Sequence, residues 1–268
     1  MTWIYAFPAW LFFIMTVVVL VGASCGGLLI YRRVIPQRED LSHNDVAGPV
    51  IGTVGTILAV VLSFLLIGNW QNYDSAASTM TLEAAAVADL YHSAAYLPAP
   101  VAAKVRGECQ TYVDAVIRDE WPAMRSGGSS GTVLRAQLAI LAAVSQYQPR
   151  NAAQQALQQN ALTLINSIAD NRRVRLFDNG QGIPMIFWAG NFLLAAITIG
   201  LCYIFRVRNG AMHVAMTGAL AAVIATLFVI TAEFDYPFRG DSQIAPLPFV
   251  HLQQVMADPS LDEANGAR

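Results

Sequence analysis

A long stretch without charge is the feature that most constrains the fold of this chain. Residues 1–31 contain no acidic or basic side chain. A helix over residues 9–31 would rise ~1.5 Å per residue and cross a hydrocarbon core of ~30 Å. Charged residues make up only 13% of the chain, whereas soluble domains contain about 25%. Further apolar runs follow at about residues 48–68, 185–205 and 211–232. We therefore predict an integral membrane protein with four transmembrane helices arranged as two hairpins.

The residues between the two hairpins are polar enough to lie in water, and their apolar positions recur with a helical period. No proline interrupts the chain between the second apolar run and Pro98, so we expect that span to continue as a helix beyond the membrane. No segment alternates with the period of a strand, so the predicted class is all-α. Further helices are expected at about residues 99–124, 132–146 and 151–177. The predicted domains are a first hairpin (1–68), a helical insert (69–183), a second hairpin (184–232), and an acidic Pro-Phe turn with a disordered polar tail (233–268).

The second apolar run has one face of small residues, recurring at steps of three and four: Gly52, Gly55, Thr56, Ala59 and Ser63. Bulky residues occupy the opposite face, among them Ile57, Val60 and Phe64. A small face in a membrane helix allows close packing against another helix. It is also compatible with lining a pore. The spacing alone leaves both interpretations open.

Motifs for catalysis and for metal binding are absent from the sequence. It contains no nucleophile elbow, phosphate-binding loop or dinucleotide fingerprint, and no pair of histidines at metal-ligand spacing. Cys25, Cys109 and Cys202 are far apart and are expected to be small buried hydrophobes. His213, near the start of the fourth run, is expected at the membrane interface. We predict no enzyme activity, no cofactor and no metal site, and the lack of a basic patch predicts no nucleic-acid partner.

Three arginines lie close together in "DNRRVRLF", residues 170–177: Arg172, Arg173 and Arg175. The favoured interpretation is a solvated helix end whose cations complement the C-terminal dipole. The other interpretation is that these arginines bind an anion or pair with an acidic side chain such as Glu108, Asp114 or Glu120.

Several short segments of the chain resemble a known family. "LSFLLIGNWQNYDSAAS" contains Asn69 and Tyr73 four residues apart, and Glu83 follows on the extended helix. "RRVRL" precedes Pro184 and Trp188, and "EFDYPFRGD" follows the last apolar run. In this order, over about residues 58–249, they resemble the bestrophin-like domain family, bacterial membrane proteins that are distantly similar to bestrophin ion channels.

The resemblance implies a homo-oligomer, by analogy a pentamer, that lies in membrane lipid and conducts small inorganic ions. In bestrophins the second span lines the pore with bulky apolar residues at three positions, which correspond here to Ala59, Ser63 and Ile67. Two of these are small, so the narrow neck is expected to be wider or wetter than in the family. The expected pore lining is Gly52, Gly55, Thr56, Ala59, Ser63 and Ile67. The expected pore mouth is Asn69, Asn72 and Tyr73.

The acidic segment after the fourth run is expected to turn at the membrane surface between Asp235 and Gly240. Pro237 would fix this turn and Phe238 would fill an apolar gap. Its carboxylates would pair with arginines near the third run, namely Arg172, Arg173 or Arg175. The simpler alternative places Tyr236 and Phe238 in the interfacial aromatic belt, with the acids in water. The carboxylates are too few for a calcium site, which needs about six or more oxygen ligands.

The arginines near the apolar runs do not fix the orientation, because the two sides carry five and four of them. They are Arg32, Arg33, Arg38, Arg206 and Arg208 on one side, and Arg172, Arg173, Arg175 and Arg239 on the other. The resemblance implies a bacterial inner-membrane protein with its insert and termini in the cytoplasm. The rival hypothesis is a non-conducting adaptor or sensor whose insert binds a partner or ligand. An adaptor needs the small face packed against another helix, whereas a channel needs it to face the axis.

Overall fold

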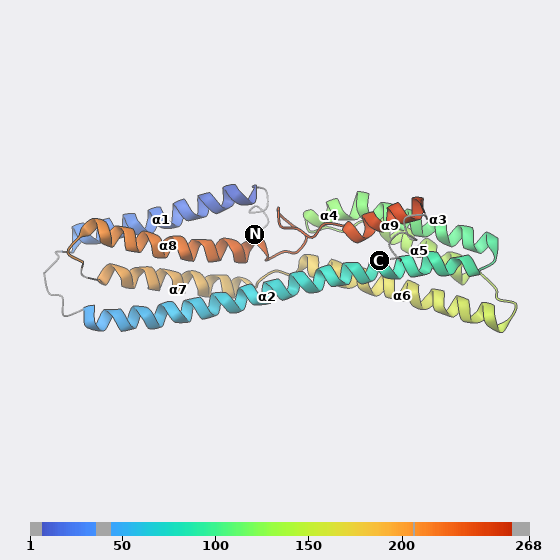
Figure 1. Ribbon diagram of the computed structural model, residues 1–268, viewed down its shortest axis with the longest axis horizontal. Helices are drawn as coiled ribbons and strands as arrows, with labels where there is room; N and C mark the ends of the chain where they lie inside the picture. The colour runs from blue at the N-terminus through green and yellow to red at the C-terminus, as the bar shows by residue number, and fades with distance from the viewer. Residues whose placement is uncertain (1–6, 36–43, 206, 259–268) are drawn as a thin grey trace. The chain divides into compact units, whose positions relative to one another are not determined.

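The computed structural model describes residues 7–35, 44–205 and 207–258 of the chain. Within these ranges all regular secondary structure is helical, so the all-α prediction is confirmed (Figure 1). Four helices are long and apolar enough to cross a membrane by length and composition. Most of the polar tail after Met256, which is expected to be disordered, falls beyond residue 258, but Ala257 is the last residue of a helix. Arg38 and Arg206 are likewise outside the described residues.

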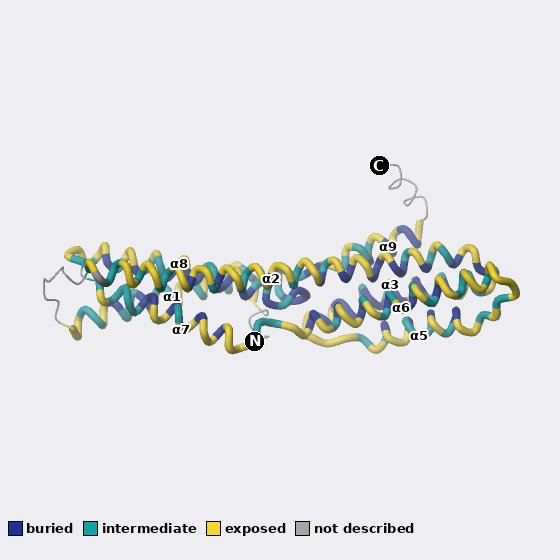
Figure 2. The backbone as a smooth tube through the Cα atoms, turned by 90° about the horizontal axis from the view of Figure 1, so that it is seen from below, coloured by how far each residue is buried: buried dark blue, intermediate teal, exposed yellow. Residues whose placement is uncertain are grey.

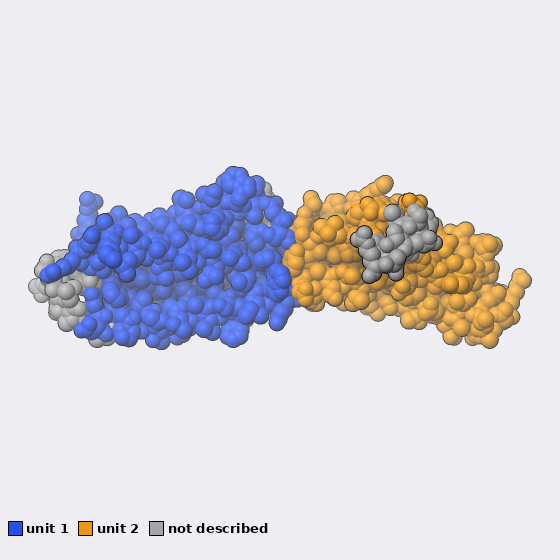
Figure 3. Space-filling view, viewed as in Figure 1, with its two compact units in different colours: residues 1–71, 182–236, 240–242 blue, residues 72–181, 237–239, 243–268 orange. Residues whose placement is uncertain are grey.

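The chain divides into two compact units, coloured separately in Figure 3. The first contains α1 (Ala9–Val34), the beginning of α2 (Asn44–Ser93), α7 (Met185–Ile204) and α8 (Gly210–Glu233). α1 packs along α8 more extensively than along any other helix. The core of this unit is formed by aromatic and branched side chains of α2, α7 and α8: Leu58, Leu62, Trp188, Ile224 and Phe228.

α2 is one continuous helix of 50 residues, because no proline follows Pro49 within it. It ends in a short 3-10 turn at Ala94–Tyr96, and Leu97 is extended immediately before Pro98, as expected for a residue that precedes proline. The second apolar run therefore does continue into the polar region, as the sequence predicts. Residues up to Gln71 belong to the first unit and the rest of the helix belongs to the second.

The second unit is built from the rest of α2 and from the remaining helices. They are α3 (Ala99–Ala115), a π-helical turn η4 (Val116–Glu120), α4 (Trp121–Arg125), α5 (Gly131–Ser145), α6 (Ala152–Gly180) and α9 (Leu247–Ala257). Ser130 and Asn151 cap α5 and α6 by accepting hydrogen bonds from backbone N–H groups of the first helical turn. The core of this unit includes Val87, Leu90 and Phe249.

Part of the acidic Pro-Phe segment is built into the core of the second unit. Phe238 is 1% exposed and packs edge-on against Trp121, with ring centroids 5.6 Å apart. The carbonyl of Pro237 accepts a hydrogen bond from the Ile244 amide at 2.8 Å. Gly240 follows with φ of 74°, a left-handed conformation that glycine adopts without strain. Phe238 is thus a buried core residue and not part of an interfacial aromatic belt.

Candidate functional site

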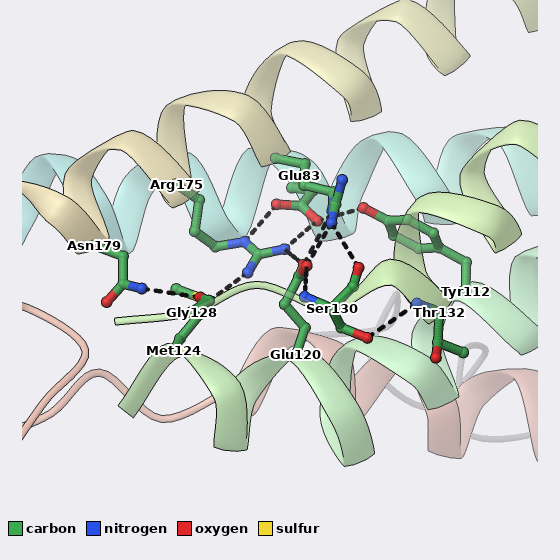
Figure 4. A network of polar contacts seen from close by, with 10 residues as sticks. Glu83, Tyr112, Glu120, Met124, Gly128, Ser130, Thr132, Arg175 and Asn179 are labelled. Carbon is green, nitrogen blue, oxygen red and sulfur yellow. Dashed lines mark hydrogen bonds and ion pairs between the residues drawn. The ribbon is translucent and has the colours of Figure 1, made fainter. Parts of the chain in front are cut away.

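An ion pair that no solvent reaches lies at the centre of the second unit (Figure 4). Glu83 of α2 and Arg175 of α6 are both fully buried. Arg175 donates from Nε to Oε2 at 2.7 Å and from Nη2 to Oε1 at 2.9 Å, so the guanidinium binds the carboxylate at two points. The Tyr112 hydroxyl donates to Oε1 of Glu83 at 2.7 Å. Three helices therefore meet at one carboxylate.

Glu120 brings a second buried carboxylate to the same arginine, with its Oε2 2.9 Å from Nη2 of Arg175. Glu120 is the last residue of the π-helical turn η4, whose wider winding alters the direction of the side chains that follow. Its carboxylate also accepts from Nε of Arg172 at 3.0 Å and from the Ser130 amide at 3.2 Å. Two carboxylates and two guanidinium groups thus form a charge-neutral network.

The network holds Glu120 and Arg175 in their charged forms. Burial alone would raise the pKa of Glu120, but the hydrogen bond from Arg172 and the positive charge of Arg175 outweigh it and lower this pKa below its usual value. Burial would lower the pKa of Arg175, but the carboxylates of Glu83 and Glu120 raise it above its usual value. Burial and the nearby charge of Glu83 raise the pKa of Tyr112 well above its usual value, so its hydroxyl keeps its proton.

The arginine cluster corrects one interpretation drawn from the sequence. Arg172 is 8% exposed and Arg175 is fully buried, so the favoured solvated helix end is wrong for both. Only Arg173 fits it, with a side chain 77% exposed and 3.3 Å from Asp170. Arg172 and Arg175 form their ion pairs with Glu83 and Glu120 rather than with the carboxylates of the acidic Pro-Phe segment. The Asp235 carboxylate instead accepts a hydrogen bond from the Ile183 amide.

The small face of α2 is not covered by other helices of its own unit. Gly52, Thr56, Ala59 and Ser63 are exposed, Gly55 is half-buried, and Ile67 is 52% exposed. A Cβ atom added at Gly52 or at Gly55 would have open space within 4 Å. Exposed residues recur along α2 in Figure 2.

Two other faces of α2 have different surroundings. Leu58 and Leu62 are 3% and 2% exposed and contact α7 and α8 within the core of the first unit. A third face presents bulky apolar side chains to the outside: Ile57, Val60 and Phe64. Successive residues of an α-helix are rotated by about 100°, so these three sets of residues point in three different directions. The first unit alone therefore buries only one side of α2.

The residues expected at the pore mouth have separate surroundings. Asn69 is 8% exposed, and its Nδ2 donates to the Thr231 carbonyl at 2.9 Å, so it joins α2 to α8. Within a single chain the Asn69 amide is therefore directed toward α8. Asn72 and Tyr73 begin the second unit and are half-buried, and Tyr73 packs against the core of that unit.

The sequence interpretation missed Tyr112 as a polar member of the network, because Tyr112 occurs within an apolar stripe of α3. A buried tyrosine hydroxyl usually has a hydrogen-bond partner, and this rule is the signal that points from Tyr112 to a nearby carboxylate. Among the residues that the structure describes, no three His, Cys, Asp or Glu side chains gather closely enough to hold a metal ion.

Comparisons with known proteins agree with this architecture. A family model described as the Bestrophin-like domain matches residues 18–249. No curated protein matches the sequence. A crystal structure of a bacterial bestrophin homolog from Klebsiella pneumoniae, carrying one substitution, has a TM-score of 0.67 at 10% identity and covers 92% of this chain and 98% of that chain. A crystal structure described as that of a membrane protein has a TM-score of 0.68 at 10% identity, covering 92% and 97%. At such identities the likeness to these structures shows the fold alone.

Proposed function

Because the chain belongs to the bestrophin-like family, we propose that it forms a homo-oligomeric ion channel whose pore is lined by α2. The proposed assembly is a pentamer in the bacterial inner membrane, with the insert and both termini in the cytoplasm. Its two hairpins would cross the membrane and the helical insert would form a vestibule. The permeant species are small inorganic ions.

The observation that carries this proposal is the uncovered small face of α2. An adaptor would pack this face against the first span or another helix, yet within a single chain Gly52 and Gly55 have open space beside them. The proposed lining is Gly52, Gly55, Thr56, Ala59, Ser63 and Ile67, and the proposed mouth is Asn69, Asn72 and Tyr73. Glu83, Arg172 and Arg175 would hold the vestibule together, with Pro237, Phe238 and Gly240 packing the Pro-Phe segment onto it. Asp235 ties the end of α8 to the start of α7.

The test combines oligomer mass with ion flux from liposomes, using the wild type and two matched substitutions. Ser63→Trp places an indole on the small face, and Phe64→Trp places the same group on the bulky face next to it. We expect a ring-forming oligomer in all three proteins, with flux abolished by Ser63→Trp and retained by Phe64→Trp. A monomer or dimer without flux above empty liposomes would overturn the channel proposal.

One observation favours the second candidate, a non-conducting adaptor. Leu134, Leu138 and Leu141 of α5, in the second unit, are 46%, 52% and 37% exposed and lie on one helical stripe. Apolar stripes of this kind mark protein–protein contacts. Within an oligomer the stripe would contact a neighbouring subunit, whereas in an adaptor it would bind a different protein. Absence of flux together with capture of a defined partner that Leu138→Glu abolishes would favour the adaptor.

A further inference from the structure

An apolar pocket of about 260 Å³ lies in the first unit where α2, α7 and α8 meet. Ile51 of α2 lines one side, Cys202 and Phe205 line a second side, and a stripe of α8 that includes Met216 lines the third. The pocket lies close to the connection between α7 and α8. Its lining suits a hydrocarbon group, since burial of apolar surface is favourable and non-directional.

One polar group in this pocket has no partner. Thr217 is 2% exposed, and its hydroxyl makes no hydrogen bond with any residue that the structure describes. Thr198, Thr226 and Thr231 in the same unit each donate to the carbonyl four residues earlier at 2.8 Å. Thr217 lines the pocket and does not make this hydrogen bond to a backbone carbonyl. Buried polar groups are normally hydrogen-bonded, so the pocket is suited to a ligand that carries an acceptor.

Basic groups lie next to the same pocket. Arg208 is exposed and directly follows Val207, which lines the pocket. The guanidinium of Arg32 lies against Gly210, where an added Cβ would be 2.7 Å from Nη1. Gly210 begins α8 and precedes the pocket-lining His213 by three residues, a rise of ~4.5 Å. Neither arginine has an ion pair within the described ranges, and the positive end of the α8 dipole adds to their field.

His213 forms part of the pocket wall. It is 4% exposed, and its Nε2 is 2.9 Å from the Cys202 carbonyl. This contact closes α7 onto α8 beside Thr217. The hydroxyl of Thr217 and the two arginines are then the groups available to a ligand.

We propose that this pocket binds an anionic phospholipid. Its phosphate would lie at Arg32 and Arg208, one acyl chain would occupy the apolar pocket, and an ester carbonyl would accept a hydrogen bond from Thr217. Charge complementarity selects the headgroup, and the apolar lining selects the chain. The site does not depend on whether the protein conducts ions.

Native mass spectrometry of the full-length protein tests the headgroup, with phosphatidylglycerol and phosphatidylcholine of identical chains as probes. We expect the wild type to retain phosphatidylglycerol several-fold better. Arg208→Gln should lower that retention about fivefold, the factor expected for one basic residue at an anionic lipid surface. Arg118→Gln, at an exposed arginine of the other unit, is the matched control. Equal retention of the two lipids, or equal effects of the two substitutions, would overturn the proposal.

The acyl-chain part is tested by Thr217→Leu, which fills the pocket, and by Thr217→Val, which removes only the hydroxyl. Both should reduce retention of phosphatidylglycerol, whereas Thr226→Val, whose hydroxyl bonds its own helix, should not. If Thr217→Leu fails to fold, Thr217→Val and Arg208→Gln still decide the question. Unchanged lipid retention with an altered oligomer mass would assign the pocket to a second copy and overturn the proposal. If inorganic phosphate protected the protein against thermal unfolding as much as phosphatidylglycerol does, the proposal would be overturned as well.

Discussion

Arg175 is fully buried between two carboxylates, so its loss leaves charges that water cannot reach. Arg175→Met should destabilise the protein by about 3–5 kcal/mol, because Glu83 and Glu120 lose their shared partner. Denaturant unfolding in detergent, followed by circular dichroism, measures this loss. Arg173→Met is the matched control on the same helix and should change little, since that side chain is largely exposed. Equal effects of the two substitutions would contradict the structural role of the network.

Glu120 gives the network a defined pH dependence. Its pKa is lowered in the folded state, so its stabilising contribution is complete above the unfolded value of about 4.3. That contribution is lost as pH falls through the lower folded value. Between about pH 5 and pH 3, the wild type should lose stability more steeply than Glu120→Gln. Thermal unfolding at several pH values checks the difference, and parallel curves would show that Glu120 does not titrate as proposed.

Cys109 is fully buried, and burial together with the charge of Glu108 raises the pKa of its thiol to about 12. Because the thiolate is the reactive form, Cys109 should resist iodoacetamide at about pH 8.5. The experiment uses a Cys25→Ala, Cys202→Ala background and mass spectrometry of the intact chain. Addition of denaturant should make the thiol reactive. Rapid labelling of the folded protein would show that this part of α3 opens readily.

At the scale of helices, the contact of α1 with α7 depends on one glycine. A Cβ at Gly27 would lie 2.6 Å from the Tyr203 hydroxyl, which donates to the Ser24 carbonyl at 2.7 Å. Gly27→Ala should therefore destabilise the protein. Gly26→Ala should be neutral or slightly stabilising, because nothing lies within 4 Å of that position and alanine favours helix.

A double substitution distinguishes a steric clash with Tyr203 from an effect of helix propensity. Tyr203→Phe removes the atom nearest to the added methyl group and leaves the next contact at 3.2 Å. Gly27→Ala should thus cost less in the Tyr203→Phe background than in the wild type, as measured by thermal unfolding in detergent. Strict additivity of the two changes would argue that α1 and α7 do not meet at this point.

Most of the long helices could be predicted from the sequence, whereas α9 (Leu247–Ala257) was not expected. Pairing of the arginines with Glu120 was one of the two interpretations drawn from the sequence and is confirmed, but their partner Glu83 could not be predicted. Apolar runs identify the four helices that are long and apolar enough to cross a membrane, and the absence of a breaker before Pro98 predicts the extension of α2. Arg172 and Arg175 lie three residues apart and share a helical face, but Glu83 is 92 residues from Arg175 in sequence. Periodicity contains no information about such distant partners. The π-helical turn that positions Glu120 also leaves no mark in the apolar pattern.

Asn69 shows the same limit on a shorter scale. Its spacing from Tyr73 supports the family resemblance and suggests a role at a pore mouth. In the structure its amide donates to the carbonyl of Thr231 in α8, a residue 162 positions away, and the motif gives no sign of this contact. A motif can therefore identify a family correctly while leaving the direction of each side chain undetermined.

For the whole molecule, the uncovered side of α2 predicts that a single chain is an incomplete unit. Gly55→Leu tests what covers that side. If the small face borders a water-filled axis, the leucine should reduce flux and leave the oligomer mass unchanged. If another subunit packs against this face, the same substitution should break the assembly, because small residues permit close helix contact. Size-exclusion chromatography with light scattering, run beside liposome flux, distinguishes the two results.

The hydroxyls on that face also bear on the sign of the ions that would pass. Thr56 and Ser63 donate their hydrogens to the Gly52 and Ala59 carbonyls, at 2.8 and 2.7 Å. Each oxygen is left with lone pairs directed outward and no hydrogen to offer. An anion that sheds water needs donors, whereas a cation needs oxygen atoms. A pore lined by this face would therefore favour the dehydration of sodium or potassium over that of chloride.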